Sequence, residues 1–288
     1  MKSVAIIIHI KKPSAKKVAI ELISWLSKRG IEVKMVKSDA SAIGRDDLGI
    51  KSDVLITNVD LLIALGGDGT ILRAVRLLGG KDVPILGVNL GKFGFLAEVD
   101  VENLYNVLSQ IIEGKYQCDK RMLLRCEVIK DGESVLERDV LNEVVAGRGA
   151  QQRLIRFKVD INGKFFANYS SDSVILATPT GSTAYSLSAG GPLISPATKV
   201  MVMTPVCPHS FFNRSIVLSK SDEVCIRCID RHAIPTITFD GITISQRESF
   251  DYLKITTSSR EVNLIKFGER DFYTVLKEKL EAWTRVGG

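Results

Sequence analysis

The sequence predicts an α/β domain with an open, mostly parallel sheet, then an all-β sandwich domain, then a helix that packs back on the first domain. Apolar runs alternate with helical stretches in the first part of the chain, which is typical of βαβ units. From about Cys118 onward, strand-like segments and hairpin dipeptides dominate. The chain has 288 residues, enough for two domains, and we place them at residues 1–118 and 119–268, with the helix at 269–288.

The α/β domain is expected to contain strands that each lead into a helix or a loop. Residues 4–8 form a continuous apolar run of the kind that a parallel sheet buries, and residues 14–29 have helical spacing. The first turn has no glycine, which makes a Rossmann dehydrogenase improbable, and the chain lacks a Gly-x-x-x-x-Gly-Lys-Ser/Thr loop, so phosphate binding must use other glycines. Further strands are predicted at residues 31–36, 60–65 and 83–88.

The all-β domain is predicted from short strand-like segments separated by turn dipeptides. Asp131-Gly132, Asn162-Gly163 and Asp240-Gly241 tolerate positive φ and therefore favour hairpins. A helix with apolar side chains near one face is predicted at residues 271–283. The predicted strands are residues 123–129, 157–161, 174–177, 200–204, 223–229, 236–239 and 253–257.

The composition indicates a globular, cytoplasmic protein that binds anions. Lys and Arg number 39 against 33 Asp and Glu, and the excess is spread along the chain, which favours anionic ligands such as nucleotides over nucleic acid. No apolar run approaches the roughly 20 residues of a membrane span. The five cysteines form no dense framework, which fits a reducing compartment. Cys225 and Cys228, with His232 beyond them, would point to opposite faces of a strand, so we predict no metal site there.

The most informative stretch is Leu-Gly-Gly-Asp-Gly-Thr at residues 65–70, where a predicted strand enters a glycine-rich loop and then a helix. Glycines at such a junction let the backbone approach a ligand closely, and the helix N-terminus adds partial positive charge, so phosphate is the natural ligand. Asp68 would repel phosphate unless it works with a metal ion or transfers a proton. An N-cap role is the alternative, and this stretch alone leaves both open.

Polar residues interrupt apolar segments at three other places. Residues 89–96 bring glycines and aromatics to the carboxyl edge of the predicted sheet, where Phe93 and Phe95 could stack on a base or simply pack. Asn142 and Glu143 interrupt an apolar strand and suit ribose hydroxyls, although one of them must point outward on any strand. Asp172 precedes another predicted strand and allows the same two interpretations.

The longest polar stretch, residues 178–192, consists mainly of small, hydroxylated and glycine residues directly after a predicted strand. Pro179 and Gly181 favour a turn. Tyr185 and Ser188 would share one face of a short helix. This density of hydroxyl groups is hard to explain by packing, and a Ser/Thr-rich turn before a capped helix is the structural alternative.

Together these stretches resemble the NAD kinases. The resemblance covers roughly residues 60–245, in the family's order and rough spacing. The glycine motif alone also resembles diacylglycerol and sphingosine kinases and 6-phosphofructokinases, and the later stretches separate these groups. The motifs are residues 66–70, residues 89–96, Asn142-Glu143, residues 178–192, and Cys207-Pro208-His209-Ser210 followed by Asn213-Arg214.

The resemblance implies an N-terminal α/β domain joined to a β-sandwich, an active site in the crevice, and homodimers or homotetramers. The implied reaction transfers a phosphoryl group from ATP, or from polyphosphate in some members, to the adenosine ribose 2′-hydroxyl of NAD, giving NADP. Mg²⁺ or another divalent metal is the expected cofactor. NAD(H), NADP(H) and ATP are the expected partners, with no nucleic acid and no membrane among them.

The family's functional residues transfer onto matching positions of this sequence. Asp68 would be the general base for the 2′-hydroxyl, with Gly69 beside it. Arg73, one helical turn further on, would reach the same phosphates or stand as an exposed cation. No metal ligand is assigned. The other implied nucleotide contacts are Phe95, Asn142, Glu143, Arg153, Ser170, Asp172, Thr183, Ala184, Tyr185, Ser186, Leu187 and Ser188.

The sequence departs from the family pattern in two places, and two other functions compete with the leading one. Residues 240–242 are Asp-Gly-Ile where many members have Asp-Gly-Gln, and Arg214 is followed by serine where proline is common.

A lipid or sugar kinase would consume no NAD, and residues 180–188 argue against it. A non-catalytic NAD(H)- or NADP(H)-binding regulator would bind without turnover, and the intact Asp68 argues against that function.

Overall fold

The structure, a computed structural model, divides into two compact units. The α/β unit comprises Met1–Lys120 and Val262–Gly288, and the β unit comprises Arg121–Glu261. The boundaries fall inside two long strands, β7 (Gln117–Lys130) and β18 (Tyr252–Lys266), so each strand contributes residues to both units. The described residues are 1–91, 94–149, 153–210, 213–230, 233–244, 250–267 and 271–286.

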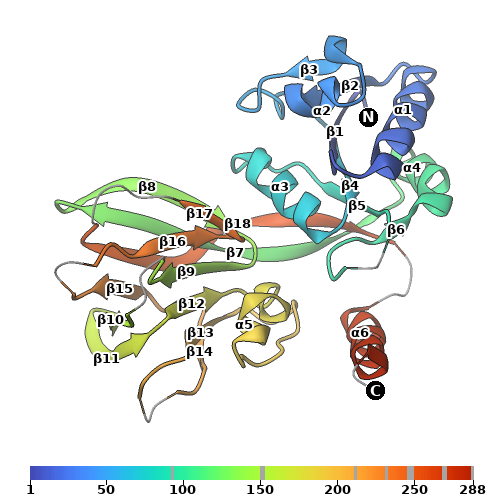
Figure 1. Ribbon diagram of the computed structural model, residues 1–288. Helices are drawn as coiled ribbons and strands as arrows, with labels where there is room; N and C mark the ends of the chain where they lie inside the picture. The colour runs from blue at the N-terminus through green and yellow to red at the C-terminus, as the bar shows by residue number, and fades with distance from the viewer. Residues whose placement is uncertain are drawn as a thin grey trace. The chain divides into compact units, whose positions relative to one another are not determined.

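A parallel sheet with the strand order β5-β4-β1-β2-β3 forms the centre of the α/β unit, as the sequence predicts (Figure 1). The short strand β6 and Leu264 of β18 also pair with β5. The strands are β1 (Ser3–Ile8), β2 (Glu32–Val36), β3 (Gly49–Ile50), β4 (Leu61–Gly66), β5 (Ile85–Asn89) and β6 (Val99–Asp100). The helices are α1 (Pro13–Ser27), α2 (Lys37–Ser41), α3 (Asp68–Leu78), α4 (Leu104–Ile112) and α6 (Phe272–Val286), with 3₁₀ turns η1 (Asp46–Leu48) and η2 (Val101–Asn103).

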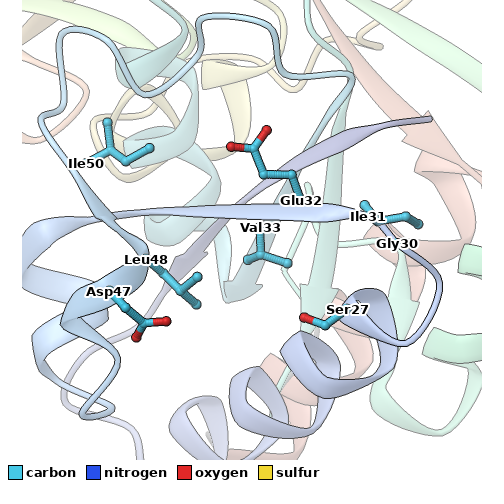
Figure 2. Close-up of a pocket in the computed structure, with 8 residues that line it drawn as sticks. All are labelled: Ser27, Gly30, Ile31, Glu32, Val33, Asp47, Leu48 and Ile50. Atoms are coloured by element: carbon cyan, nitrogen blue, oxygen red, sulfur yellow. The ribbon is translucent and has the colours of Figure 1, made fainter.

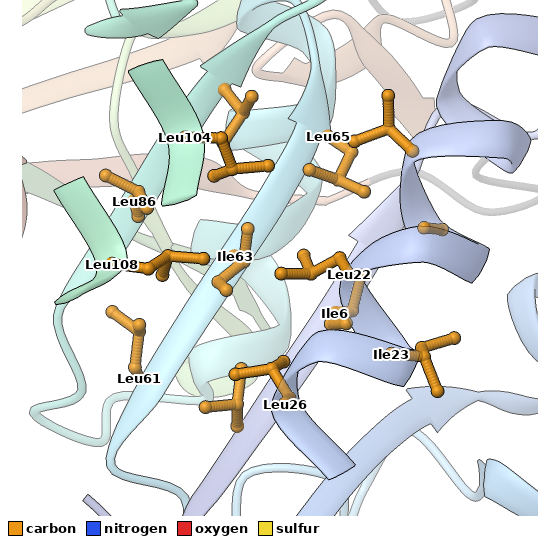
Figure 3. Packing of buried hydrophobic residues seen from close by; sticks show 14 of the residues in the cluster. Ile6, Leu22, Ile23, Leu26, Leu61, Ile63, Leu65, Leu86, Leu104 and Leu108 are labelled. Atoms are coloured by element: carbon orange, nitrogen blue, oxygen red, sulfur yellow. The ribbon is translucent and has the colours of Figure 1, made fainter. Parts of the chain in front are cut away.

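Apolar side chains from β1 and β4 pack against α1 and α4 to form the core of the α/β unit (Figure 3). Ile6 and Ile63 are fully buried in this cluster, together with Leu108 of α4. Leu22 and Leu26 follow each other after one turn of α1, so both lie on the face of the helix that meets the sheet. The helix predicted from the spacing of residues 14–29 is therefore present as α1.

The strand register brings the carboxyl ends of β1, β4 and β5 to the same edge of the sheet. Ile8 pairs with Leu65, and Leu65 in turn pairs with Val88. Each of these residues is followed within one or two positions by a loop, and open α/β sheets bind ligands at this edge. The loop after Gly66 and the loop after Asn89 therefore meet where a ligand is expected.

The β unit is an antiparallel sandwich, which confirms the second part of the predicted fold. One sheet has the order β14-β13-β12-β9-β16-β17, and the other face contains β11-β10-β15-β18 and the hairpin of β7 and β8. The strands are β8 (Glu133–Val140), β9 (Glu143–Gly147), β10 (Ile155–Ile161), β11 (Lys164–Ser171), β12 (Ser173–Ala177), β13 (Val200–Val206), β14 (Ile216–Ser219), β15 (Val224–Cys228), β16 (Thr236–Phe239) and β17 (Ile242–Ile244). A 3₁₀ turn η3 (Gly181–Thr183) and the short helix α5 (Tyr185–Ser188) follow β12.

The predicted hairpin dipeptides all adopt the backbone conformation that the sequence requires of them. Asp131, Asn162 and Asp240 have φ values of 53°, 51° and 46°, and the glycine after each also has positive φ. These turns connect β7 to β8, β10 to β11 and β16 to β17.

Among the described residues, no helix is both long and apolar enough to span a bilayer.

Candidate active site

The glycine loop lies between β4, which ends at Gly66, and α3, which begins at Asp68. A Cβ on Gly66 would lie 2.1 Å from Oγ1 of Thr70, so internal packing explains this glycine. A Cβ on Gly67 or Gly69 would meet nothing within 4 Å, and neither residue has positive φ. Neither packing nor a positive φ requires these two glycines. Gly67 is the N-cap residue of α3, where glycine is favoured over alanine, and close approach of a ligand is a further physical reason for both glycines.

Asp68 does not cap its own helix, which decides between the two interpretations of this residue. Helix α3 has no side-chain cap at its N-terminus. The Asp68 carboxylate instead accepts the N–H of Phe95 at 2.8 Å and the N–H of Leu96 at 3.1 Å. A Cβ on Gly94 would lie 1.9 Å from Oδ1 of Asp68, so only glycine leaves room for the carboxylate. The loop after β5 therefore holds Asp68 in place.

The start of the loop after β5 is organised by Asn89, which is buried at the end of its strand. Its side chain donates to the carbonyl of Gly91 at 2.8 Å and accepts the N–H of the same residue at 3.2 Å. A Cβ on Gly91 would lie 2.7 Å from Nζ of Lys12, so an ammonium group lies against this loop. Lys92 and Phe93, which belong to the predicted motif, lie outside the described residues.

Phe95 packs within the α/β unit. Its ring centroid lies 6.3 Å from that of Phe272 on α6, and Nζ of Lys279 lies 5.5 Å from the Phe95 ring. The ring is only partly buried, so these contacts leave part of it accessible. The contact with Phe272 also shows that the C-terminal helix packs on the α/β unit, as predicted.

Arg73 is neither an exposed cation nor directed away from the protein. Its guanidinium donates to both carboxylate oxygens of Asp39, at 2.6 Å and 3.0 Å, and to the carbonyl of Ile8 at 3.3 Å. Asp39 is fully buried, and the Arg73 side chain is partly buried. This partner was not predictable from the sequence, because Asp39 lies on another helix, α2.

In the β unit, Asn142 and Glu143 lie at a break between two strands rather than inside one strand, which corrects the sequence-based expectation. Strand β8 ends at Val140 and β9 begins at Glu143. Asp240 explains the break, because its carboxylate accepts the N–H groups of Leu141, Asn142 and Glu143 at 3.0, 2.7 and 3.2 Å. These amides are satisfied by a side chain instead of a neighbouring strand.

Glu143 carries the most perturbed carboxyl group of the candidate site. The side chain is buried, and its Oε2 has no hydrogen-bond partner among the described residues. Burial, followed by the negative charge of Asp240, raises the pKa of Glu143 to about 8, against a smaller opposing effect of the Tyr185 N–H. A buried acceptor without a partner, next to an accessible helix, is suited to a ligand that donates hydrogen bonds.

The hydroxyl-rich segment after β12 packs against the break between β8 and β9. Thr178 donates through Oγ1 to the carbonyl of Leu141, and its N–H bonds the carbonyl of Asn142 at 2.9 Å. A Cβ on Gly181 would lie 2.1 Å from the carbonyl oxygen of Asn142, so this glycine permits the close contact. Residues 141–143 and 178–185, far apart in sequence, therefore form one packed and largely buried cluster with Asp240.

The residues of this segment divide into buried and exposed groups. Ser186 is fully buried and bonds Oγ1 of Thr204 at 3.2 Å, and Thr204 contacts Ser215 at 2.9 Å, so this chain of hydroxyls anchors α5 to β13. Tyr185 and Ser188 are exposed and available to a ligand. Thr183, which bonds the carbonyl of Thr180 at 3.1 Å, and its neighbours Ala184 and Leu187 are partly exposed.

Asp172 lies between β11 and β12 and has a partner that the sequence did not reveal. Nε of Arg148 donates to its carboxylate at 2.6 Å, and the N–H of Arg148 donates to its carbonyl at 2.9 Å. Ser170, two residues earlier, accepts the N–H of His209 at 2.7 Å through its carbonyl. Arg153 is exposed at the start of the segment that leads into β10.

The structure thus brings Asp68 and Phe95 together in the α/β unit and Glu143 together with residues 183–188 in the β unit. Sequence reasoning missed Asp39, Arg148 and Asp240 as partners of the predicted site residues. Asp240 was noticed in the sequence as a hairpin residue and as part of the Asp-Gly-Ile departure from the family pattern, and neither observation pointed to the amides that it accepts. No local pattern indicates which distant amide a carboxylate will accept.

The α/β unit contains a pocket of about 470 Å³ (Figure 2), and its lining includes no residue of the glycine loop. Glu32 in its lining pairs with Ser3 at the start of β1, whereas Leu65 pairs with Ile8 at the end of that strand. The start of β2 in this lining therefore lies at the other end of β1 from the glycine loop, while Ile50 in the same lining pairs with Val36 at the end of β2. The pocket is lined by Ser27, Gly30, Ile31, Glu32, Val33, Asp47, Leu48 and Ile50.

No cluster of three or more His, Cys, Asp or Glu side chains that could hold a metal ion occurs in the part of the chain that the structure describes. Cys225 and Cys228 both lie on β15, and burial is the main cause that raises the pKa of each thiol. His232 lies outside the described residues. Any divalent cation at the candidate site would need ligands from a bound nucleotide as well as from the protein.

The fold and the two groups of residues define a class of protein. In the α/β unit, the loop after β4 contains two glycines with open space beside them and the Asp68 carboxylate, which backbone N–H groups hold in place. In the β unit, the buried carboxyl group of Glu143 has an oxygen without a hydrogen-bond partner among the described residues. These features belong to enzymes that act on nucleotides and their phosphate groups.

Comparison with known proteins identifies the family. Residues 4–116 match the ATP-NAD kinase N-terminal domain, and residues 141–267 match the ATP-NAD kinase C-terminal domain. The NAD kinase of Caldanaerobacter subterraneus subsp. tengcongensis is 40% identical over 280 residues, which cover 97% of this chain and 99% of the relative. The NAD kinase of Natranaerobius thermophilus is 36% identical over 286 residues, which cover 99% of this chain and 100% of the relative. This chain belongs to the ATP-NAD kinase family and is a phosphotransferase.

Solved structures agree with this assignment. Yeast NADH kinase, crystallised in complex with NADH, has a TM-score of 0.89 and 29% sequence identity, covering 98% of this chain and 88% of the yeast chain. An NAD kinase from Archaeoglobus fulgidus in complex with ATP has a TM-score of 0.75 at 22% identity, covering 98% of this chain and 99% of that chain. The second comparison shows the shared fold.

The two kinds of glycine in the loop make different predictions. Gly66→Ala should lower the free energy of unfolding by about 1–3 kcal/mol, because the new Cβ would overlap Thr70. Gly67→Ala should lower the free energy of unfolding by no more than about 1 kcal/mol, the cost of alanine at the N-cap of α3, but raise the KM for nucleotide, because the ligand would occupy the space that the new Cβ fills. Denaturant unfolding and steady-state kinetics separate these effects. A Gly67→Ala protein that has a normal KM for nucleotide would contradict the ligand explanation.

Glu143 should make stability depend on pH. Its pKa in the folded protein is about 8, above its ordinary value of 4.5, so between these pH values the unfolded chain loses a proton that the folded protein keeps. Stability should therefore fall as pH rises through this window, with a slope of up to about 1.4 kcal/mol per pH unit. Glu143→Gln should remove this dependence in denaturant unfolding at pH 5 and pH 8, whereas the exposed Glu133→Gln should keep it. Parallel curves for wild type and Glu143→Gln would refute the assignment.

Proposed function

We propose that this enzyme transfers the terminal phosphoryl group of ATP to the adenosine ribose 2′-hydroxyl of NAD, giving NADP, with Asp68 as the general base. The observation that carries the proposal is the Asp68 carboxylate, which two backbone N–H groups and the required Gly94 hold inside a glycine loop. Membership of the ATP-NAD kinase family supports the choice of substrates. A base in such a place can contribute on the order of a hundredfold to the rate.

The α/β unit supplies groups suited to phosphate. Gly67 and Gly69 leave their backbone accessible at the N-terminus of α3, where the helix dipole favours negative charge. Lys12 places an ammonium group against Gly91 on the neighbouring loop, where it can offset the charge of a phosphate group. Because the transition state of phosphoryl transfer has little covalent bonding, positioning and charge neutralisation should contribute more than basicity does.

The β unit supplies groups suited to the dinucleotide. The unpartnered Oε2 of Glu143 can accept a hydrogen bond from a ribose hydroxyl or an exocyclic amine, and Asn142 lies beside it. The exposed Tyr185 and Ser188 of α5 offer hydroxyl groups. The yeast relative was crystallised with NADH, so NADH is a second acceptor to be tested beside NAD.

The proposal also includes a divalent cation that binds together with the phosphate groups of ATP. Each oxygen of the Asp68 carboxylate accepts one N–H, so each keeps a further lone pair that a cation can use. Mg²⁺ commonly binds through one or two carboxylates and substrate phosphates, and it would neutralise charge that develops on the transferred group. Asp68 is thus the residue that would contact the ion.

The proposal also includes assembly into a homodimer or homotetramer in the cytoplasm. The edge strand β11 presents Phe165, which is 59% exposed, and a large apolar side chain at an unpaired strand edge favours association. Light scattering of the purified protein should give a mass at least twice that of one chain. A single-chain mass at micromolar concentration would contradict this part of the proposal.

Asp68→Asn should lower NADP formation from NAD, ATP and Mg²⁺ by at least about a hundredfold. The amide cannot accept both the Phe95 and Leu96 N–H groups, so unfolding must be measured alongside turnover to show that the variant is folded. The matched control is Asp53→Asn, because Asp53 is an exposed aspartate in the same unit. Unchanged turnover of a folded Asp68→Asn protein would exclude the base assignment.

A further inference from the structure

A buried ion pair lies directly behind the glycine loop. Asp39 of α2 is fully buried, and Arg73 of α3 donates to its two carboxylate oxygens at 2.6 Å and 3.0 Å. The flat guanidinium fits this two-pronged contact better than any other cation does. The side chain of Arg73 is 28% exposed, so most of it is occupied by contacts within the protein.

At the end of β1, the ion pair supplies the hydrogen bonds that a neighbouring strand would otherwise supply. The register of β2 on β1 extends only to Ile6 and Met35. The N–H of His9 bonds Leu65 on β4, so the backbone groups of the preceding residue, Ile8, face the side that β2 has left. Asp39 accepts the Ile8 N–H at 2.9 Å, and Arg73 donates to the Ile8 carbonyl at 3.3 Å. Both backbone groups are thereby satisfied.

These contacts fix the start of α3 relative to the sheet. Arg73 lies five residues after Asp68, which is about 7.5 Å along a helix axis. Strand β1 pairs with β4 up to Ile8 and Leu65, and β4 leads through the glycine loop into α3. The ion pair connects α3 back to the end of β1, so the loop that carries Asp68 is held at both of its ends.

We propose that Asp39 and Arg73 are positioning residues that hold Asp68 in its reactive place, and that Arg73 acts through Asp39 instead of binding a phosphate group. This inference rests on the proposed function, in which Asp68 is the base. A displacement of about 1 Å in a reacting group can lower a rate on the order of a hundredfold without weakening substrate binding. Loss of the ion pair should therefore lower kcat and leave the KM for ATP nearly unchanged.

The test is a double-mutant cycle of Asp39→Asn, Arg73→Gln and the combined variant. NADP formation is measured per folded molecule, well below the melting temperature of each variant, with KM determined for both ATP and NAD. Each single change should lower kcat by at least about tenfold with less than about threefold change in either KM. The combined variant should lose no more than the worse single variant, because both changes break one interaction and the two amides can pair with each other. The matched control is the exposed pair Arg45→Gln and Asp47→Asn, which should leave kcat unchanged.

The possible outcomes separate this inference from the proposed function. If Arg73→Gln raises the KM for ATP or NAD while Asp39→Asn is nearly harmless, Arg73 binds substrate directly and the inference is wrong. If the singles lower only the melting temperature and leave kcat per folded molecule unchanged, the pair is structural and the inference is again wrong. If wild type itself forms no NADP from NAD and ATP, the proposed function fails and this inference fails with it.

Discussion

Backbone N–H groups that lack a strand partner are the constraint on which both units depend. A buried N–H without a partner costs about 1–3 kcal/mol, so each one must find an acceptor where a strand ends. In this protein the acceptors are carboxylates: Asp39 for Ile8, Asp68 for the loop after β5, and Asp240 for the break before β9. Each carboxylate thereby also fixes the segment that carries a candidate functional group. The hydrogen bonds that satisfy these backbone N–H groups are therefore the same contacts that position the candidate functional groups.

The carboxyl groups nevertheless differ in what they leave available to a ligand. Asp240 accepts three backbone amides, whereas one oxygen of the neighbouring Glu143 finds no hydrogen-bond partner in the described part of the chain. Burial and the charge of Asp240 raise the pKa of Glu143 to about 8, so Glu143 keeps its proton at pH values where an ordinary glutamate has lost it. Two acids with different environments can thus perform two tasks, one structural and one in recognition.

Several features were predictable from the sequence because they depend on neighbouring residues. The buried run of β1, the helical face of Leu22 and Leu26, and the positive φ of Asp131, Asn162 and Asp240 each follow from local pattern or from a residue's own conformational preference. The glycine loop at a strand–helix junction was found for the same reason. The break at Leu141 and Asn142 was not, because it is caused by a carboxylate 98 residues away from Asn142.

The sequence by itself determined the fold class, because hydrophobic periodicity indicates helices and strands. It also determined the family and the candidate residues Asp68, Glu143 and the segment from Thr178 onward, because these belong to motifs of adjacent residues. The tertiary structure alone decided which groups these residues contact. Asp68 accepts amides 27 and 28 residues away, and Arg73 pairs with an aspartate 34 residues away. Hydrogen-bond partners so distant are chosen by how helices and strands pack. A local sequence pattern specifies the period and turn of its own segment, and it contains no information about which distant backbone group will be left without a partner.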